Sequence, residues 1–309
     1  MATEDPHAAR RLDAVAVQAT LRRLARAPEP PWLHAEVARR MAQRLEIVRA
    51  RPNRILDWWS GLGAGAAELQ RVHPQAGVVA VEPEAIWAAR TRAARARPWW
   101  RRADPHAAAS QVHEEADEIA PGAGLVWANM MLHAVVDPPA LFARWEALLA
   151  PEGFVMFSCL GPGSLRELRT LYDGLGWGSA TPGFVDMHDL GDMLVRAGFA
   201  DPVMDQEVLT LTWPDAEALL AELRGLGGNA APDRHPGLRT PRWRQHLLEG
   251  LAAMAGADGR IALSFEVAYG HAFKAAPRLR TDAPTRVSLD SMRSLLPSRR
   301  DRNAGRALG

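Results

Sequence analysis

A glycine-rich turn between a buried strand and a helix is the feature that most constrains this sequence. Residues 55–65 read ILDWWSGLGAG, with Asp57 where the strand would end and glycines at 61, 63 and 65. Glycine has no Cβ, so such a turn can be tight and its backbone can approach a ligand closely. Strand, turn and helix together predict the first unit of a doubly wound α/β sheet, where ligands bind beyond the carboxyl ends of the strands.

The rest of the chain alternates strand-like and helix-like segments, as α/β folds do. The expected strands are 54–57, 77–82, a short one at 99–103, 124–129, 154–160, 202–213 and 260–274. The last two alternate polar and apolar residues with period two, which predicts an antiparallel pair at a sheet edge. A mostly parallel sheet with an antiparallel terminal hairpin is typical of Rossmann-like methyltransferases rather than of the all-parallel dehydrogenase sheet.

Three regions are expected along the chain. Residues 1–50 read as N-terminal helices, and residues 51–275 as the sheet domain. A mostly helical segment at about 214–256, between the last two strands, indicates an insertion or cap. Residues 276–309 are rich in Arg, Pro and Ser and indicate a flexible tail.

Composition excludes several classes of protein. The 37 Lys and Arg residues nearly balance 36 Asp and Glu, which gives no reason to expect nucleic acid or a membrane surface as partner. The only cysteine, Cys159, excludes an intrachain disulfide and a cysteine-rich metal site, and it indicates a reducing compartment. Neither a signal peptide nor a spanning apolar run is evident. We therefore expect a cytoplasmic protein without a metal.

Polar residues at the expected strand ends fit S-adenosylmethionine. The open turn at Gly61 and Gly63 would admit the methionyl part, and Glu82 could accept two hydrogen bonds from a ribose diol. Asp104 is placed to accept from the adenine amino group, although Asp-Pro pairs are also ordinary turn formers. The alternatives are that the glycines form only a turn and that Glu82 is only a solvated strand end. The expected cofactor residues are Asp57, Gly61, Gly63, Glu82, Asp104 and Asn129.

Four stretches then resemble one family, the malonyl-carrier-protein O-methyltransferases of biotin synthesis. They are FVMFSCLGPGSLRELRTLY, FVDMHDLGDMLVRAGFADPVMD, ALLAELRGLGGNAAPDRHPGL and FEVAYGHAFK. The resemblance runs from about residue 33 to 275 and is most specific in 154–229. It implies a class I methyltransferase fold. It also implies methyl transfer from S-adenosylmethionine to the free carboxylate of a malonyl thioester on acyl carrier protein.

Such a carboxylate is already ionised at neutral pH, so we expect no catalytic base. The enzyme would hold oxygen, methyl and sulfur in line and exclude water. The resemblance implies an arginine after the GLGGN segment as partner of the carboxylate, and Arg234 lies nearest that place, since a guanidinium binds a carboxylate through two hydrogen bonds. His133 could contact the substrate or serve only in capping or packing. The arginines at 239, 242 and 244 could steer an acidic carrier protein.

Two tryptophans depart from the family pattern. Trp58 fills an apolar position, but Trp59 replaces a glycine that permits positive φ and leaves room for the cofactor, which tryptophan does not easily do. In a divergent enzyme Trp59 would swing outward and the later glycines would serve instead. The alternatives are a non-catalytic, methyltransferase-like binding protein with impaired cofactor binding, or a methyltransferase for another small carboxylic acid. The surviving Glu82 and glycines favour the enzyme.

Overall fold

The computed structural model describes residues 12–95 and 111–275. The expected strand at 99–103 and the expected cofactor residue Asp104 lie outside these ranges. Within these ranges, the helices lack the length and hydrophobicity that a membrane span requires.

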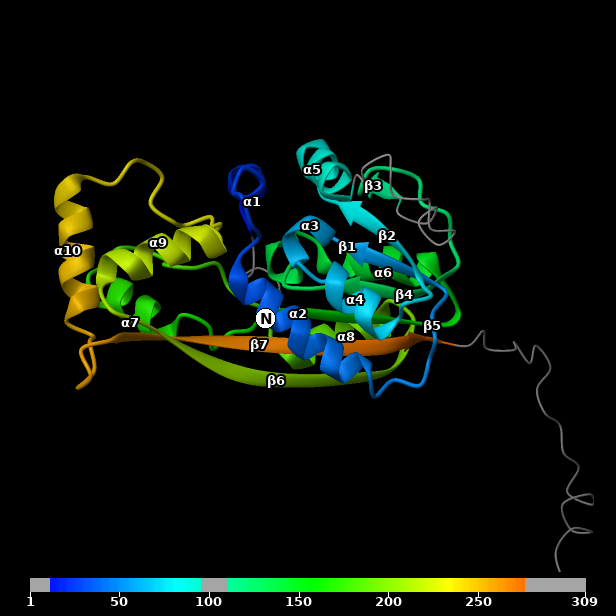
Figure 1. Cartoon of the computed structure of the whole chain (residues 1–309). Coiled ribbons are helices and arrows are strands. Elements are labelled where there is room, and N and C mark those ends of the chain that lie inside the picture. The colour runs from blue at the N-terminus through cyan, green and yellow to red at the C-terminus, as the bar shows by residue number, and fades with distance from the viewer. Residues whose placement is uncertain (1–11, 96–110, 276–309) are drawn as a thin grey trace, which may run out of the picture. The chain divides into compact units, whose positions relative to one another are not determined.

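The described residues form a seven-stranded sheet in the order β3-β2-β1-β4-β5-β7-β6 (Figure 1). The strands are β1 (Arg54–Trp58), β2 (Gly77–Glu82), β3 (Val112–Glu114), β4 (Ala123–Ala128), β5 (Leu149–Leu160), β6 (Phe199–Trp213) and β7 (Ile261–Lys274). β3, β2, β1, β4 and β5 run parallel, whereas β7 is antiparallel to both β5 and β6. The expected mostly parallel sheet with an antiparallel terminal hairpin is confirmed.

The helices precede, connect and extend these strands. They are α1 (Ala14–Leu24), α2 (Trp32–Leu45), α3 (Ser60–Gly63), α4 (Ala66–Val72), α5 (Ala85–Arg95), the 3-10 turn η3 (Leu132–Ala134), α6 (Pro138–Leu148), α7 (Arg166–Gly174), α8 (Met187–Arg196), α9 (Ala216–Leu226) and α10 (Pro241–Ala252). In the sequence, α9 and α10 follow β6 and precede β7; α10 packs against both α9 and α7 (Figure 1). We call α9, α10 and the segment joining them the cap.

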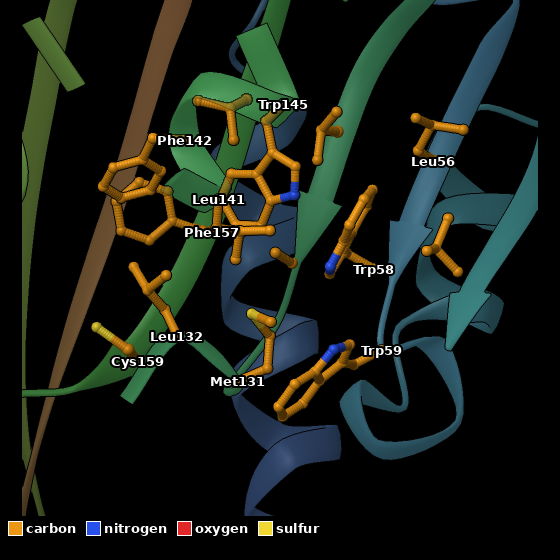
Figure 2. Packing of buried hydrophobic residues seen from close by; sticks show 14 of the residues in the cluster. Leu56, Trp58, Trp59, Met131, Leu132, Leu141, Phe142, Trp145, Phe157 and Cys159 are labelled. Atoms are coloured by element: carbon orange, nitrogen blue, oxygen red, sulfur yellow. The ribbon is translucent and has the colours of Figure 1, made fainter. Parts of the chain in front are cut away.

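Both faces of the sheet are apolar, because alternate residues of each central strand point to opposite sides. Ile55 of β1 packs with α2 and α4, whereas Leu56 and Trp58 pack with α6 and α8 on the other face. Trp58 is fully buried, stands edge-on to Trp145 with 5.9 Å between ring centroids, and donates from Nε1 to Glu115 (Figure 2). Trp58 therefore fills an ordinary core position.

Candidate active site

The strand order brings the expected site residues to one edge of the sheet. β1 lies between β2 and β4, and Trp58 pairs in register with Val81 and Ala128. Glu82 and Asn129, which follow those two partners, therefore flank the turn that begins after β1. This is the carboxyl edge, where α/β sheets bind their ligands.

Trp59 adopts the positive-φ conformation that a tryptophan does not easily take. Its φ of 54° and ψ of 47° are left-handed, and its N–H donates to the Val81 carbonyl at 2.6 Å. A non-glycine residue in this region carries a strain of about 1–2 kcal/mol. Its side chain is only 4 % exposed and lies near Met131 (Figure 2), so the expectation that it swings outward is wrong. Burial of the indole offsets the strain.

The Glu82 carboxylate serves the turn itself. Its Oε1 accepts from the Gly61 N–H at 2.9 Å and from the Thr91 hydroxyl at 2.6 Å. A Cβ on Gly61 would lie 2.9 Å from Thr91 Oγ1 and 3.0 Å from the Trp87 ring, so the protein's own packing requires this glycine. Glu82 is fully buried, its Oε2 has no partner, and burial raises its pKa to about 7.

Asp57 is the second buried carboxyl at this edge. Its Oδ2 accepts from the Ser60 hydroxyl, and Arg95 lies 4.0 Å away. Its Oδ1 has no partner, and burial raises its pKa to about 6. Asp57 Oδ1 and Glu82 Oε2 are therefore two unused acceptors in the place where a ribose diol or an ammonium group could donate.

Asn129 is saturated by the protein. Its Nδ2 donates to the carbonyls of His34 at 2.8 Å and Gly63 at 2.6 Å, and its Oδ1 accepts from the Ser158 hydroxyl at 2.7 Å. A Cβ on Gly63 would come within 3.2 Å of the Asn129 carbonyl oxygen. Asn129 thus ties the turn to α2 and β5, and it has no Nδ2 hydrogen left to donate to a cofactor.

α1 covers this edge of the sheet and is hydrogen-bonded both to α5 and to the cap. Towards α5, the indole of Trp87 in that helix donates to the Leu21 carbonyl at 3.1 Å. On the cap side, the Asp13 N–H donates to the Ala230 carbonyl at 2.9 Å, and the Arg23 guanidinium donates to cap carbonyls. Asp57 Oδ1 and Glu82 Oε2 could accept hydrogen bonds from the hydroxyl and ammonium groups of S-adenosylmethionine. In this conformation, however, both oxygens are buried by the protein.

An apolar cavity of about 440 Å³ lies next to the turn. Leu62 of α3 lines it, as do residues of α1, α2, η3, the end of β5 and the cap. Its polar lining includes Arg23, His34, His133, Thr181 and Arg224. The expected substrate residue His133 therefore faces the cavity.

The sequence interpretation missed His34, although the signal was present. His34 lies three and four residues before Val37 and Ala38 on the apolar face of α2, and it is 3 % exposed. A histidine that lies on the apolar face of a helix is expected to be buried and is therefore a candidate for a ligand-binding residue.

Arg234 is not part of the cavity lining. Its guanidinium donates to the Asp13 carboxylate at 2.7 Å and to the Ala231 carbonyl at 2.8 Å. Because Asp13 also caps the N-terminus of α1, this pair ties the cap to the first helix. The structure thus does not bring Arg234 together with His133. Among the described residues, no group of three or more His, Cys, Asp or Glu side chains is placed to hold a metal.

Comparison with known proteins agrees with this geometry. The sequence profile of a family described as "Methyltransferase domain" matches residues 32–201. A malonyl-[acyl-carrier protein] O-methyltransferase from Gallionella capsiferriformans is 38 % identical, covering 81 % of this chain and 87 % of that protein. The enzyme of the same name from Laribacter hongkongensis is 36 % identical, covering 80 % and 84 %.

Among solved structures, the YcgJ protein of Bacillus subtilis superposes with a TM-score of 0.50 at 11 % identity, covering 77 % of this chain and 98 % of that one. At this identity the likeness concerns the fold alone. The profile match and the long, high-coverage similarities show the family: this chain belongs to the malonyl-[acyl-carrier protein] O-methyltransferases and is a methyltransferase with a Rossmann-like α/β fold.

Proposed function

We propose that the protein transfers a methyl group from S-adenosylmethionine to the free carboxylate of a malonyl thioester carried by acyl carrier protein, a step of biotin synthesis. The observation that carries this proposal is the cavity beside the glycine turn, which shares Leu62 with it. An acceptor in the cavity and a donor at the turn would meet at the carboxyl edge of the sheet. The names of the similar proteins supply the substrate class.

For the donor, we assign two acceptor atoms and one enclosing segment. Glu82 Oε2 would accept from the ribose hydroxyls, and Asp57 Oδ1 from the methionyl ammonium, since both oxygens are unused in the protein. S-adenosylmethionine supplies the electrophilic methyl group when bound. The protein contributes binding, orientation and exclusion of water, and α1 with Trp87 provides the cover. Because Glu82 is enclosed, donor binding must displace part of this cover.

For the acceptor, the cavity offers an apolar channel with a cationic rim. Arg23 and Arg224 line it, and neither has a carboxylate partner among the described residues, since Arg23 donates only to backbone carbonyls. Such cations suit the phosphate of a carrier protein's prosthetic arm. Arg239, Arg242 and Arg244 belong to the cap, although Arg244 is already paired with Glu217.

A second candidate function is that of a non-catalytic, methyltransferase-like binding protein. The complete enclosure of Glu82 and the buried indole of Trp59 favour it. In that case the cavity would still bind an acyl ligand, but no methyl group would move.

A transfer assay separates these functions. Donor carrying a labelled methyl group is incubated with the full chain and malonyl-carrier protein, and the carrier is analysed by intact-mass spectrometry. We expect one methyl group on the malonyl carrier and none on the unloaded carrier. Arg224→Gln should slow transfer to the carrier, whereas Arg196→Gln, an exposed arginine of α8 outside the cap and the cavity lining, is the matched control. Methylation of free dicarboxylic acids instead would indicate another carboxylic acid as substrate, and no transfer would favour the binding protein.

A further inference from the structure

Two histidines of the cavity have hydrogen bonds that fix where their protons lie. The His34 Nδ1 lies 2.9 Å from the Leu62 carbonyl oxygen. A carbonyl can only accept, so Nδ1 carries the hydrogen. Burial lowers the pKa of His34 to about 4, so the ring is neutral at neutral pH and its Nε2 is a bare acceptor.

His133 has the opposite tautomer. Its Nδ1 lies 3.3 Å from the backbone nitrogen of Leu160, which can only donate, so Nδ1 is the unprotonated nitrogen. Burial and the neighbouring His34 lower the pKa of His133 to about 3, which leaves this ring neutral as well. Its Nε2 therefore carries the hydrogen and is a donor. Phe184, another cavity residue, holds the ring edge-on at 6.2 Å.

The two free nitrogens thus form a complementary pair, one acceptor and one donor, in an apolar cavity. A single group that both donates and accepts satisfies such a pair, as a protonated carboxyl does. A bare carboxylate or an ester offers acceptors only, so neither satisfies both nitrogens.

We propose that His34 and His133 bind the carboxyl group of the methyl acceptor, with His133 Nε2–H donating to one oxygen and a single proton shared between the other oxygen and His34 Nε2. This assignment rests on the proposed function for the identity of the acceptor. The carboxyl-binding role that the sequence assigned to Arg234 thus passes to two neutral imidazole rings, because the Arg234 guanidinium is paired with Asp13. Arg234 then acts as a positioning residue that holds α1 against the cap.

The charges around the cavity require the shared proton. The charged side chains that line it are Arg23 and Arg224, and the remaining titratable ones are the two histidines. Arg224 is exposed and the Arg23 guanidinium donates to two cap carbonyls, so both cations are already solvated or hydrogen-bonded without a carboxylate. A bare carboxylate facing the lone pair of His34 would be repelled and poorly solvated. Binding therefore takes up one proton from water, and this proton lies between the carboxyl and His34 Nε2. When the carboxyl oxygen receives the methyl group, the proton is left on His34 and returns to water, so the reaction as a whole neither gains nor loses a proton.

Calorimetry of a soluble acceptor tests this directly. Malonyl-pantetheine is titrated into the full chain at pH 7.5 in buffers of different ionisation enthalpy, and the slope of observed heat against that enthalpy counts the protons taken up. We expect a slope close to one proton per ligand. The methyl ester of the same thioester has no carboxyl to share a proton and should bind with a slope near zero.

The matched variants separate binding from folding. In His34→Asn, the amide can still donate to the Leu62 carbonyl, but the Nε2 acceptor is lost. We expect the variant to bind the acid at least about tenfold more weakly than wild type, because a charge-assisted hydrogen bond is lost. Binding of the acid should no longer take up a proton, and the affinity for the ester should be unchanged. His73→Asn is the control, because His73 is buried but does not line the cavity; this variant should bind the acid as wild type does.

Each outcome decides the proposal. Wild-type protein that binds the acid without proton uptake overturns the histidine pair and leaves the proposed function intact. Failure of the wild-type protein to bind either thioester, in the presence of S-adenosylhomocysteine, contradicts the proposed acceptor and the pair together. The wild-type slope needs no variant, so it remains decisive if His34→Asn does not fold.

Discussion

Replacement of Glu82 by glutamine should change the pH dependence of stability in a defined direction. Burial raises the pKa of this carboxyl from its ordinary 4.5 to about 7. Between these values the folded protein holds a proton that the unfolded chain has released. The free energy of unfolding therefore falls as pH rises through this window, and the contribution present below pH 4.5 is lost above about pH 7.

The magnitude follows from the same two values. At about 1.4 kcal/mol per pH unit, the free energy of unfolding of the wild-type protein should fall by about 3 kcal/mol as pH rises from 4.5 to about 7. Glu82→Gln keeps an acceptor for Gly61 and Thr91 but has no proton to lose. At low pH the variant should be equal to or less stable than wild type, because its amide donor stays unpaired. Its relative stability should then improve by about 3 kcal/mol as pH rises.

Urea unfolding followed by tryptophan fluorescence at several values between pH 4.5 and 8 measures this difference, since the chain has 11 tryptophans. Glu118→Gln, on an exposed position of the β3–β4 connection, is the control and should show a constant difference from wild type. A constant difference for Glu82→Gln as well would refute the reasoning, because it would mean that the buried carboxyl does not carry the proton.

Three further substitutions test other parts of the structure. Gly61→Ala places a methyl group 2.9 Å from Thr91 Oγ1 and should cost about 1–3 kcal/mol in urea unfolding, whereas Gly225→Ala, which meets nothing within 4 Å in α9, should be neutral or stabilising. Trp59→Gly should destabilise by about 2 kcal/mol, because the loss of a buried indole exceeds the relief of left-handed strain; a gain in stability would show that the strain dominates. Arg234→Ala should change stability by about 1 kcal/mol or less, since its ion pair with Asp13 is partly exposed, but should speed proteolysis within α1; unchanged cleavage would show that the pair does not anchor the helix.

The sheet could be predicted because its strands leave strong local signals. The apolar runs of β1, β4 and β5 are buried on both faces, and the alternation along β6 and β7 marks an antiparallel edge. β3 was missed because it is three residues long and only partly buried, so it has no apolar run. A strand that pairs through its backbone alone leaves little trace in side chains.

The site was predictable only in outline. The strand ends located Asp57, Glu82 and Asn129, but not that Asn129 would be saturated by His34 and Gly63. The engagement of Arg234 could not be foreseen, because its partner Asp13 lies 221 positions away in sequence. Such pairings depend on how α1 and the cap meet, which no local pattern encodes.

The central claim is that this chain, despite the indoles of Trp58 and Trp59 beside its glycine turn, holds a methyl donor at the carboxyl edge of its sheet. Titration calorimetry of S-adenosylmethionine into the wild-type chain and into Glu82→Ala tests it most directly, with Glu118→Ala as the matched control. The account predicts saturable one-to-one binding by wild type and by Glu118→Ala, and its loss in Glu82→Ala. A wild-type chain that gives no binding heat at millimolar donor, or a Glu82→Ala variant that binds as tightly as wild type, would contradict it.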